Sequence, residues 1–335
     1  MANVLNYISY LLIRLFMATF AALPMSFGFA FAKALGVAGY YLLPGRRKIA
    51  LENLELALGA ERTEEERERI ARESFINAAY SAMEMIHFER IIAEWKERFS
   101  FEGDELIDEM IRKKKGFFVF GGHLGAWMML PIFPKRFIPG NVVIRPQRNP
   151  YFDRYLRRLV EKWGGRMINT RGTGDLIEDL AKKGEMVGFY MDQESRREQG
   201  VFVDFFGRPA SSHVVPPYLA WKHDIPMFPY WMPRETPGRV NVIFKPPVEF
   251  VKTGDKDNDI RVNTQRLARE VEDTIRRYPE QWFWVHRRWK RQMDGSDREE
   301  RKKLKKRGKS KRGRGAYVTS KDVSARESKQ SGDKQ

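Results

Sequence analysis

The sequence predicts an α/β protein in which helices flank a mostly parallel sheet. From residue 117 onward, short apolar runs rich in β-favouring residues alternate with segments that suit helices. The chain has 335 residues, 42% of them hydrophobic, which is enough to bury a sizeable core. One such run, Phe117–Phe120, ends in two glycines and His123, which is typical of a strand that turns into a helix. This order of elements indicates parallel strands joined by crossover helices.

The first part of the chain is its most apolar. Residues 4–43 consist of two apolar segments separated by Pro24, and the first is long enough to cross a hydrocarbon core of ~30 Å. Arg14 lies near its centre and disfavours a full span, so an interfacial helix pair and a buried hairpin in a soluble domain are alternatives. The basic residues at 46–48 favour the cytoplasmic face. We expect residues 1–45 to form a membrane-anchoring helical segment.

Residues 46–290 are expected to form one domain. Helices are predicted between residues 50 and 92, one of them capped at Thr63, and the short segment after His123 should end before Pro131. The strands that we expect are 99–102, 117–120, 142–145, 167–168, 186–191, 227–232, 239–244 and 282–284. The helices that we expect are 106–114, 151–163, 174–183, 214–223 and 262–277.

The last segment, residues 291–335, differs in composition. It holds 16 Lys and Arg against 7 Asp and Glu, or +9 of the formal charge of +17, and almost no large apolar residue. Such a segment cannot bury enough surface to fold, so a disordered basic tail is predicted. It contains no motif that reads bases, and we expect no nucleic-acid partner.

Residue types exclude several chemistries. The chain has no cysteine, which rules out disulfides, a thiolate nucleophile and cysteine-ligated metals. Its five histidines include no i, i+4 pair, which argues against a histidine-rich metal centre. We expect neither a metal nor another cofactor.

Polar side chains follow three of the predicted strands. His123 follows 117–120, Arg145 closes 142–144, and Asp192 comes directly after an apolar strand. The carboxyl ends of parallel strands lie at one edge of a sheet, where ligands bind, so these side chains should meet there. Helix capping or turn formation is the alternative role for His123 and for Asp192.

Four stretches together resemble the late acyltransferases of lipid A biosynthesis, within the lysophospholipid acyltransferase superfamily. The resemblance covers roughly residues 5–290 and implies a glycerolipid acyltransferase-like fold. The stretches are Gly-His-Leu-Gly-Ala-Trp at 122–127, Arg145 with Arg-Asn-Pro-Tyr at 148–151 and Arg-Arg at 157–158, Met-Asp-Gln at 191–193 with Val-Asp-Phe-Phe-Gly-Arg-Pro-Ala at 203–210, and Pro-Glu-Gln-Trp-Phe-Trp-Val-His-Arg-Arg-Trp-Lys at 279–290.

The resemblance implies that His123 is the catalytic base. Acyl transfer to a hydroxyl needs a group that takes the hydroxyl proton, and without a cysteine or a G-x-S-x-G elbow we expect direct attack assisted by His123. The family places an Asp or Glu five residues after this histidine, whereas this chain has Met128, whose thioether is a weak acceptor. Three interpretations follow: Asp192 replaces the missing acid, the enzyme is slow, or the chain is a catalytically silent homologue.

Further residues are candidates for substrate contacts. The resemblance implies a substrate- or oxyanion-stabilising role for Arg145. Arg157 and Arg158 lie on a nearby predicted helix and either bind substrate or are solvated. The segment Phe205-Phe206-Gly207 is predicted to be a loop with a tight turn near the acyl site, and Ser211 or Ser212 should cap the next helix.

The expected function is acyl transfer at the cytoplasmic face of the inner membrane. The donor would be acyl carrier protein or acyl-CoA, and the acceptor a hydroxyl of a lipid A precursor or a related glycolipid. Acyl carrier protein is acidic, so a basic surface would speed the encounter. The alternatives are acyl transfer to another polar lipid and a non-catalytic homologue that binds membrane or glycolipid.

Overall fold

A computed structural model describes residues 2–132, 136–137, 140–170, 172–196 and 200–294. The chain divides into two units, residues 1–290 and 291–335. Nearly all of the predicted basic tail lies outside the described residues, so its disorder stays a prediction. The boundary predicted at residue 45 also stays a prediction.

A mostly parallel sheet forms the centre of the first unit, as predicted. In the described part of the chain its strands follow the order β1-β10-β8-β2-β5-β3-β4, with β9 paired to β10. The five strands from β8 to β4 are mutually parallel, whereas β10 runs antiparallel to β8 and carries β1 beside it. The bounds are β1 Phe99–Glu102, β2 Phe117–Gly121, β3 Gly140–Ile144, β4 Arg166–Asn169, β5 Met186–Tyr190, β8 Met227–Trp231, β9 Arg234–Thr236 and β10 Arg239–Phe244.

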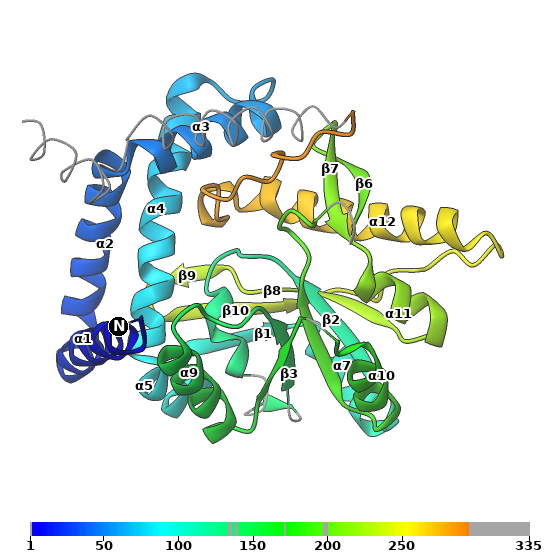
Figure 1. The fold of residues 1–335 in the computed structure, drawn as a ribbon, viewed down its shortest axis with the longest axis horizontal. Helices are drawn as coiled ribbons and strands as arrows, with labels where there is room; N and C mark the ends of the chain where they lie inside the picture. The colour runs from blue at the N-terminus through cyan, green and yellow to red at the C-terminus, as the bar shows by residue number, and fades with distance from the viewer. Residues whose placement is uncertain (1, 133–135, 138–139, 171, 197–199, 295–335) are drawn as a thin grey trace, which may run out of the picture. The chain divides into compact units, whose positions relative to one another are not determined.

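Side chains of β2 alternate between two hydrophobic cores, because successive residues of a strand point to opposite faces. Phe118 and Phe120 belong to the core that includes α12, and Phe117 and Val119 belong to the core that includes α9. These two helices lie on opposite sides of the strands (Figure 1). The helices of this part are α7 Asp104–Arg112, α9 Pro150–Lys162, α10 Gly174–Lys182, α11 Val215–His223 and α12 Lys256–Arg277. The predicted helix-flanked sheet is confirmed.

Helices also make up the N-terminal part. They are α1 Ala2–Ala22, α2 Met25–Leu42, α3 Pro44–Leu58, α4 Glu64–Ile86, α5 Phe88–Ala93 and α6 Trp95–Arg98. The predicted cap of α4 is confirmed as a capping box between Thr63 and Glu66. At Gly36 of α2, a Cβ would lie 2.5 Å from the Ile76 backbone, so glycine is what lets α2 approach α4 this closely.

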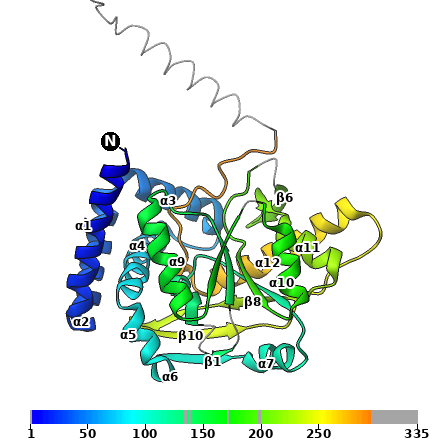
Figure 2. The same ribbon diagram turned by 60° about the horizontal axis from the view of Figure 1, so that its bottom comes forward.

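The helix α1 combines an exposed apolar face with a packed face. Its segment Asn3–Ala22 is long and apolar enough to cross a membrane, yet helix α1 also rests on α9. Tyr7 packs edge-on against Tyr151 with ring centroids 5.1 Å apart, and Arg14 lies 3.9 Å from the ring centroid of Tyr155. Figure 2 shows α1 and α2 together at one side of the molecule, where Phe20 and Phe31 pack at 4.6 Å. The positive charge of Arg14, which disfavours a full membrane span, therefore faces the protein.

Three local predictions are wrong. The segment after His123 is a 3-10 helix, Trp127–Ile132, that continues through Pro131. Trp282 makes a single bridge to Leu124 and starts no strand. Ser211 and Ser212 lie in a hairpin of β6 Gly200–Phe205 and β7 Arg208–His213, so neither caps a helix.

Candidate active site

His123 lies at the carboxyl edge of the sheet, two residues after β2 ends. Two backbone hydrogen bonds join the loop that carries His123 to the C-terminal part of the domain. The His123 carbonyl accepts from Phe283 N at 3.0 Å, and Gly125 N donates to the Gln281 carbonyl at 3.0 Å. Gly125 has φ +61 and contacts the Met232 backbone so closely that a Cβ would lie 2.1 Å from its oxygen. Only glycine fits this turn, which sets the direction of the His123 side chain.

Asp192 reaches the same edge from β5, the parallel neighbour of β2. Its Oδ1 lies 2.9 Å from His123 Nδ1, and its Oδ2 accepts from the His123 backbone N at 2.9 Å. Trp282 Nε1 donates to the same Oδ2 at 2.8 Å. A Cβ on Gly122 would lie 3.0 Å from the Asp192 Cβ, so the glycine directly before His123 makes room for the carboxylate. The predicted meeting of His123 and Asp192 is confirmed.

The Asp192 carboxyl group is ionised at neutral pH. Burial alone would raise its pKa, but the charge of His123 and the hydrogen bonds from His123 and Trp282 outweigh burial and lower the pKa to about 2. A carboxylate accepts hydrogen bonds and cannot donate them, so the contact with Asp192 assigns the proton to Nδ1 and leaves Nε2 as the basic atom of the ring. The pair thus presents a base whose positive charge, once formed, is compensated.

Two neighbouring aromatic residues contact the imidazole of His123. The ring centroid of His123 lies 4.6 Å from that of Trp127 and 4.8 Å from that of Tyr190. The Tyr190 hydroxyl donates to the Trp127 carbonyl at 2.8 Å, which links the two rings. The His123 side chain remains 16% exposed, so a substrate hydroxyl can reach it while Asp192 is almost fully buried.

A buried ion pair lies beneath this loop. Arg234 donates to Glu84 through Nε at 2.7 Å and Nη2 at 2.8 Å, and both side chains are almost fully buried. The carbonyl of Gly125 accepts from Arg234 at 3.2 Å and from Ser81 at 2.9 Å. Charged, bidentate bonds of this kind fix geometry, so the network holds the turn that positions His123.

The arginines predicted for substrate contact occupy different places. Arg145 is exposed directly after β3, at the same sheet edge as His123. Arg157 donates to Asp153, to the Met167 carbonyl and to Asn169, so its guanidinium joins α9 to β4. Arg158 is exposed and lines a separate cavity. Substrate binding by these residues stays a prediction.

The segment Phe205-Phe206-Gly207 forms the turn of the β6–β7 hairpin. Phe206 and Gly207 have φ of 57 and 71, which confirms a tight turn. Phe205 is buried, with its ring centroid 6.2 Å from that of Trp282, and the Arg288 guanidinium lies 4.8 Å from it. Phe205 therefore packs against Trp282, whose indole donates to Asp192.

Met128 lies half-buried in the 3-10 helix after His123. A carboxylate at position 128 would serve to orient His123 through Nδ1. In this chain Asp192 already forms the hydrogen bond with that nitrogen. The indole of Trp282 is a site residue that the sequence did not indicate, although it belongs to one of the four quoted stretches.

The fold and the site together define a mostly parallel α/β protein with a histidine–aspartate pair at the carboxyl edge of its sheet. The family model described as bacterial lipid A biosynthesis acyltransferase matches residues 2–291, and the chain belongs to this family.

The names of similar proteins describe the same class of enzyme. The chain is 27% identical over 274 residues to a lipid A biosynthesis lauroyltransferase of Escherichia coli K12, covering 78% of this chain and 84% of the relative. It is 28% identical over 282 residues to the lipid A biosynthesis myristoyltransferase of the same strain, covering 80% and 83%. A palmitoleoyltransferase of that strain is 25% identical over 262 residues, covering 76% and 82%.

Proposed function

We propose that this chain is an active O-acyltransferase that moves a fatty acyl group from acyl carrier protein or acyl-CoA to a hydroxyl of a lipid A precursor or a related glycolipid. Membership of the family supports the reaction class. The observation that carries the activity is the bond between His123 Nδ1 and Asp192 Oδ1 at 2.9 Å.

Direct attack needs one base and no covalent enzyme intermediate. Nε2 of His123 takes the proton of the acceptor hydroxyl while its oxygen attacks the thioester carbonyl carbon. The tetrahedral intermediate then breaks its carbon–sulfur bond, and the imidazolium returns the proton to the leaving thiolate. Asp192 keeps Nδ1 protonated and stabilises the imidazolium through both stages.

In this mechanism Met128 is compatible with activity. The family's acid is absent at that position, but its role as partner of the base passes to Asp192, which is buried and ionised. Catalytic silence would be favoured if His123 lacked a carboxylate partner. The pairing of these two groups therefore supports the active enzyme over the non-catalytic homologue.

Acyl transfer by the purified full-length protein tests the proposal. A lipid A precursor in mixed micelles is incubated with lauroyl- or myristoyl-loaded acyl carrier protein or acyl-CoA, and the lipid is analysed by mass spectrometry. We expect the mass increase of one added acyl ester. Binding of the precursor without transfer from any donor would support the non-catalytic homologue, and transfer only to another polar lipid would reassign the acceptor.

We also propose that α1 and α2 attach the protein to the cytoplasmic face of the inner membrane. One face of α1 packs on α9, where Asn149 Nδ2 donates to the Asn6 carbonyl at 2.7 Å. The other face leaves Leu12 63% exposed and Leu15 67% exposed, and Leu42 of α2 is 75% exposed. Exposed apolar side chains of this kind are typical of a helix pair that lies in the membrane interface.

The double variant Leu12→Glu, Leu15→Glu should reduce binding to phospholipid vesicles by at least about tenfold, because two carboxylates would enter the apolar interface. Vesicle co-sedimentation of the full-length protein measures this. Leu176→Glu is the control, since Leu176 is exposed on α10, away from α1 and α2. Undiminished sedimentation of the double variant would place the membrane contact elsewhere.

A further inference from the structure

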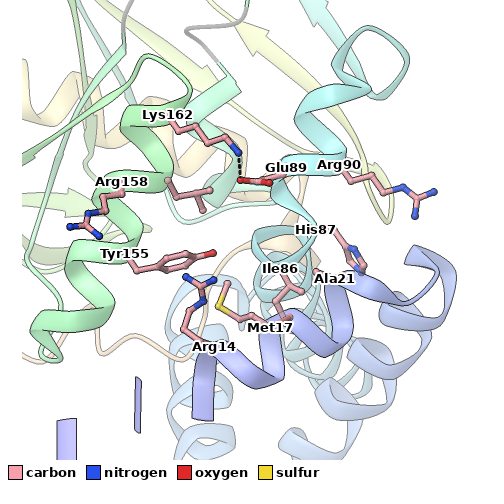
Figure 3. Close-up of a pocket in the computed structure, with 12 residues that line it drawn as sticks. Arg14, Met17, Ala21, Ile86, His87, Glu89, Arg90, Tyr155, Arg158 and Lys162 are labelled. Atoms are coloured by element: carbon pink, nitrogen blue, oxygen red, sulfur yellow. Dashed lines mark hydrogen bonds and ion pairs between the residues drawn. The ribbon is translucent and has the colours of Figure 1, made fainter. Parts of the chain in front are cut away.

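A second polar site lies between α1, α9 and the start of α5. Residues of these helices and the end of α4 line a cavity of about 470 Å³ (Figure 3). It shares no lining residue with the His123–Asp192 site. We propose that this cavity binds the phosphate of an anionic phospholipid headgroup.

Positive charge dominates the cavity wall. Four cations, Arg14, Arg90, Arg158 and Lys162, line it together with a single carboxylate, Glu89, which pairs with Lys162 at 2.6 Å. Arg90 and Arg158 both turn outward in Figure 3, and Arg90 lies 3.4 Å from Glu94, which leaves Arg14 and Lys162 beside the cavity. A phosphate would thus meet a net positive site, where charge-assisted hydrogen bonds are strong.

Arg14 is the cation best placed to meet a ligand. Its guanidinium stacks over Tyr155, and its Nε is buried with no hydrogen-bond partner among the described residues. Buried donors in proteins are almost always hydrogen-bonded, and a phosphate oxygen in the cavity would give this one a partner. Arg14 is also the only charged residue of α1, so its position inside an otherwise apolar helix is explained by such a ligand.

His87 borders the cavity on the side of α2. It lines the cavity, is only 2% exposed, and neither ring nitrogen has a hydrogen-bond partner in the described parts of the chain. Burial, assisted by the charges of Arg90 and Arg98, lowers its pKa, so the ring is neutral at pH 7. Its Nε2 faces α2, where a Cβ on Gly28 would lie 2.7 Å away, so His87 adds no charge to the cavity and the cations carry the anion site.

The place of the cavity favours a lipid over free phosphate. On the same helix as Arg14, Leu11 is 47% exposed and Leu15 is 67% exposed on the apolar face. A phospholipid whose acyl chains lie along this face would carry its phosphate to the level of Arg14 and Lys162. The lipid source rests on the proposed membrane contact of α1, whereas the anion site rests on the cavity itself.

Lipid titration of the full-length protein in detergent micelles, followed by native mass spectrometry, tests the site. We expect saturable binding of one phosphatidylglycerol per chain, weakened by about tenfold or more in Arg14→Leu and in Lys162→Ala. Arg14→Lys keeps the charge and should retain most of the binding. Lys33→Ala is the matched control, because it removes an exposed cation from α2 outside the cavity.

Each contrary outcome is distinct. Equal loss in Lys33→Ala would show general charge attraction and overturn the site. Equal binding of diacylglycerol, which has no phosphate, would do the same. If inorganic phosphate alone bound to the cavity as tightly as phosphatidylglycerol does, the assignment to a lipid headgroup would be overturned. Thermal unfolding of each variant identifies a loss of fold, and acyl transfer measured on the same samples keeps this site separate from the proposed reaction.

Discussion

Replacing His123 with alanine should lower the rate of acyl transfer by about 10²–10⁴-fold, because the variant lacks the group that takes the acceptor proton. The fold should persist, since the side chain borders the sheet edge and is 16% exposed. Steady-state transfer with saturating donor measures the loss, and circular dichroism checks the fold.

A second histidine–carboxylate pair supplies the control. His223, at the end of α11, lies 2.9 Å from Glu178, but the chain leaves this helix to enter β8, so the pair is at the opposite edge of the sheet. His223→Ala should leave transfer within about twofold of the parent. An active parent whose rate is unchanged by His123→Ala would refute the mechanism.

Asp192→Asn should be of comparable severity. Asparagine keeps the size of the side chain but removes the negative charge that Asp192, with its pKa lowered to about 2, places beside the imidazolium. In serine proteases the equivalent change costs about 10⁴ in turnover, because the histidine takes the wrong tautomer. We therefore expect a loss of about 10³–10⁴-fold in kcat with a smaller change in KM.

A purely structural role for Asp192 would give a different result. Its bonds to the His123 backbone and Trp282 also hold the loop, so the variant could lose stability. Urea unfolding separates the two roles. A mild kinetic effect, explained by the fraction of unfolded protein, would show that Asp192 caps the turn and that His123 works without a charged partner.

The contact between His123 and Asp192 could be predicted from sequence because each residue closely follows an apolar strand. Parallel strands place their carboxyl ends together, so a correct assignment of the two strands was enough to predict that His123 and Asp192 lie close to each other. Trp282 could not be predicted in the same way. Its role depends on a bridge to Leu124 across the fold, and a run of aromatic residues does not specify such a contact.

The tight turn at Phe206 and Gly207 was predicted, but the β6–β7 hairpin that contains it was missed for a local reason. Both turn residues, Phe206 and Gly207, have positive φ, the conformation for which Asn-Gly or Asp-Gly is the usual signal. Phenylalanine at the first position hides this signal, and tertiary packing of Phe206 against the Arg276 guanidinium at 4.6 Å supports the turn instead. For Arg157, likewise, the sequence indicated the helix but could not show that the side chain bonds to β4.

The most direct test of the central claim is a double-mutant cycle on acyl transfer, comparing the parent, His123→Ala, Asp192→Asn and the double variant. If Asp192 acts through His123, the double variant should be no slower than His123→Ala alone, because groups that work as one unit give non-additive losses. Losses that multiply, so that the double variant falls by the product of the two single effects, would contradict the pairing of these residues in catalysis.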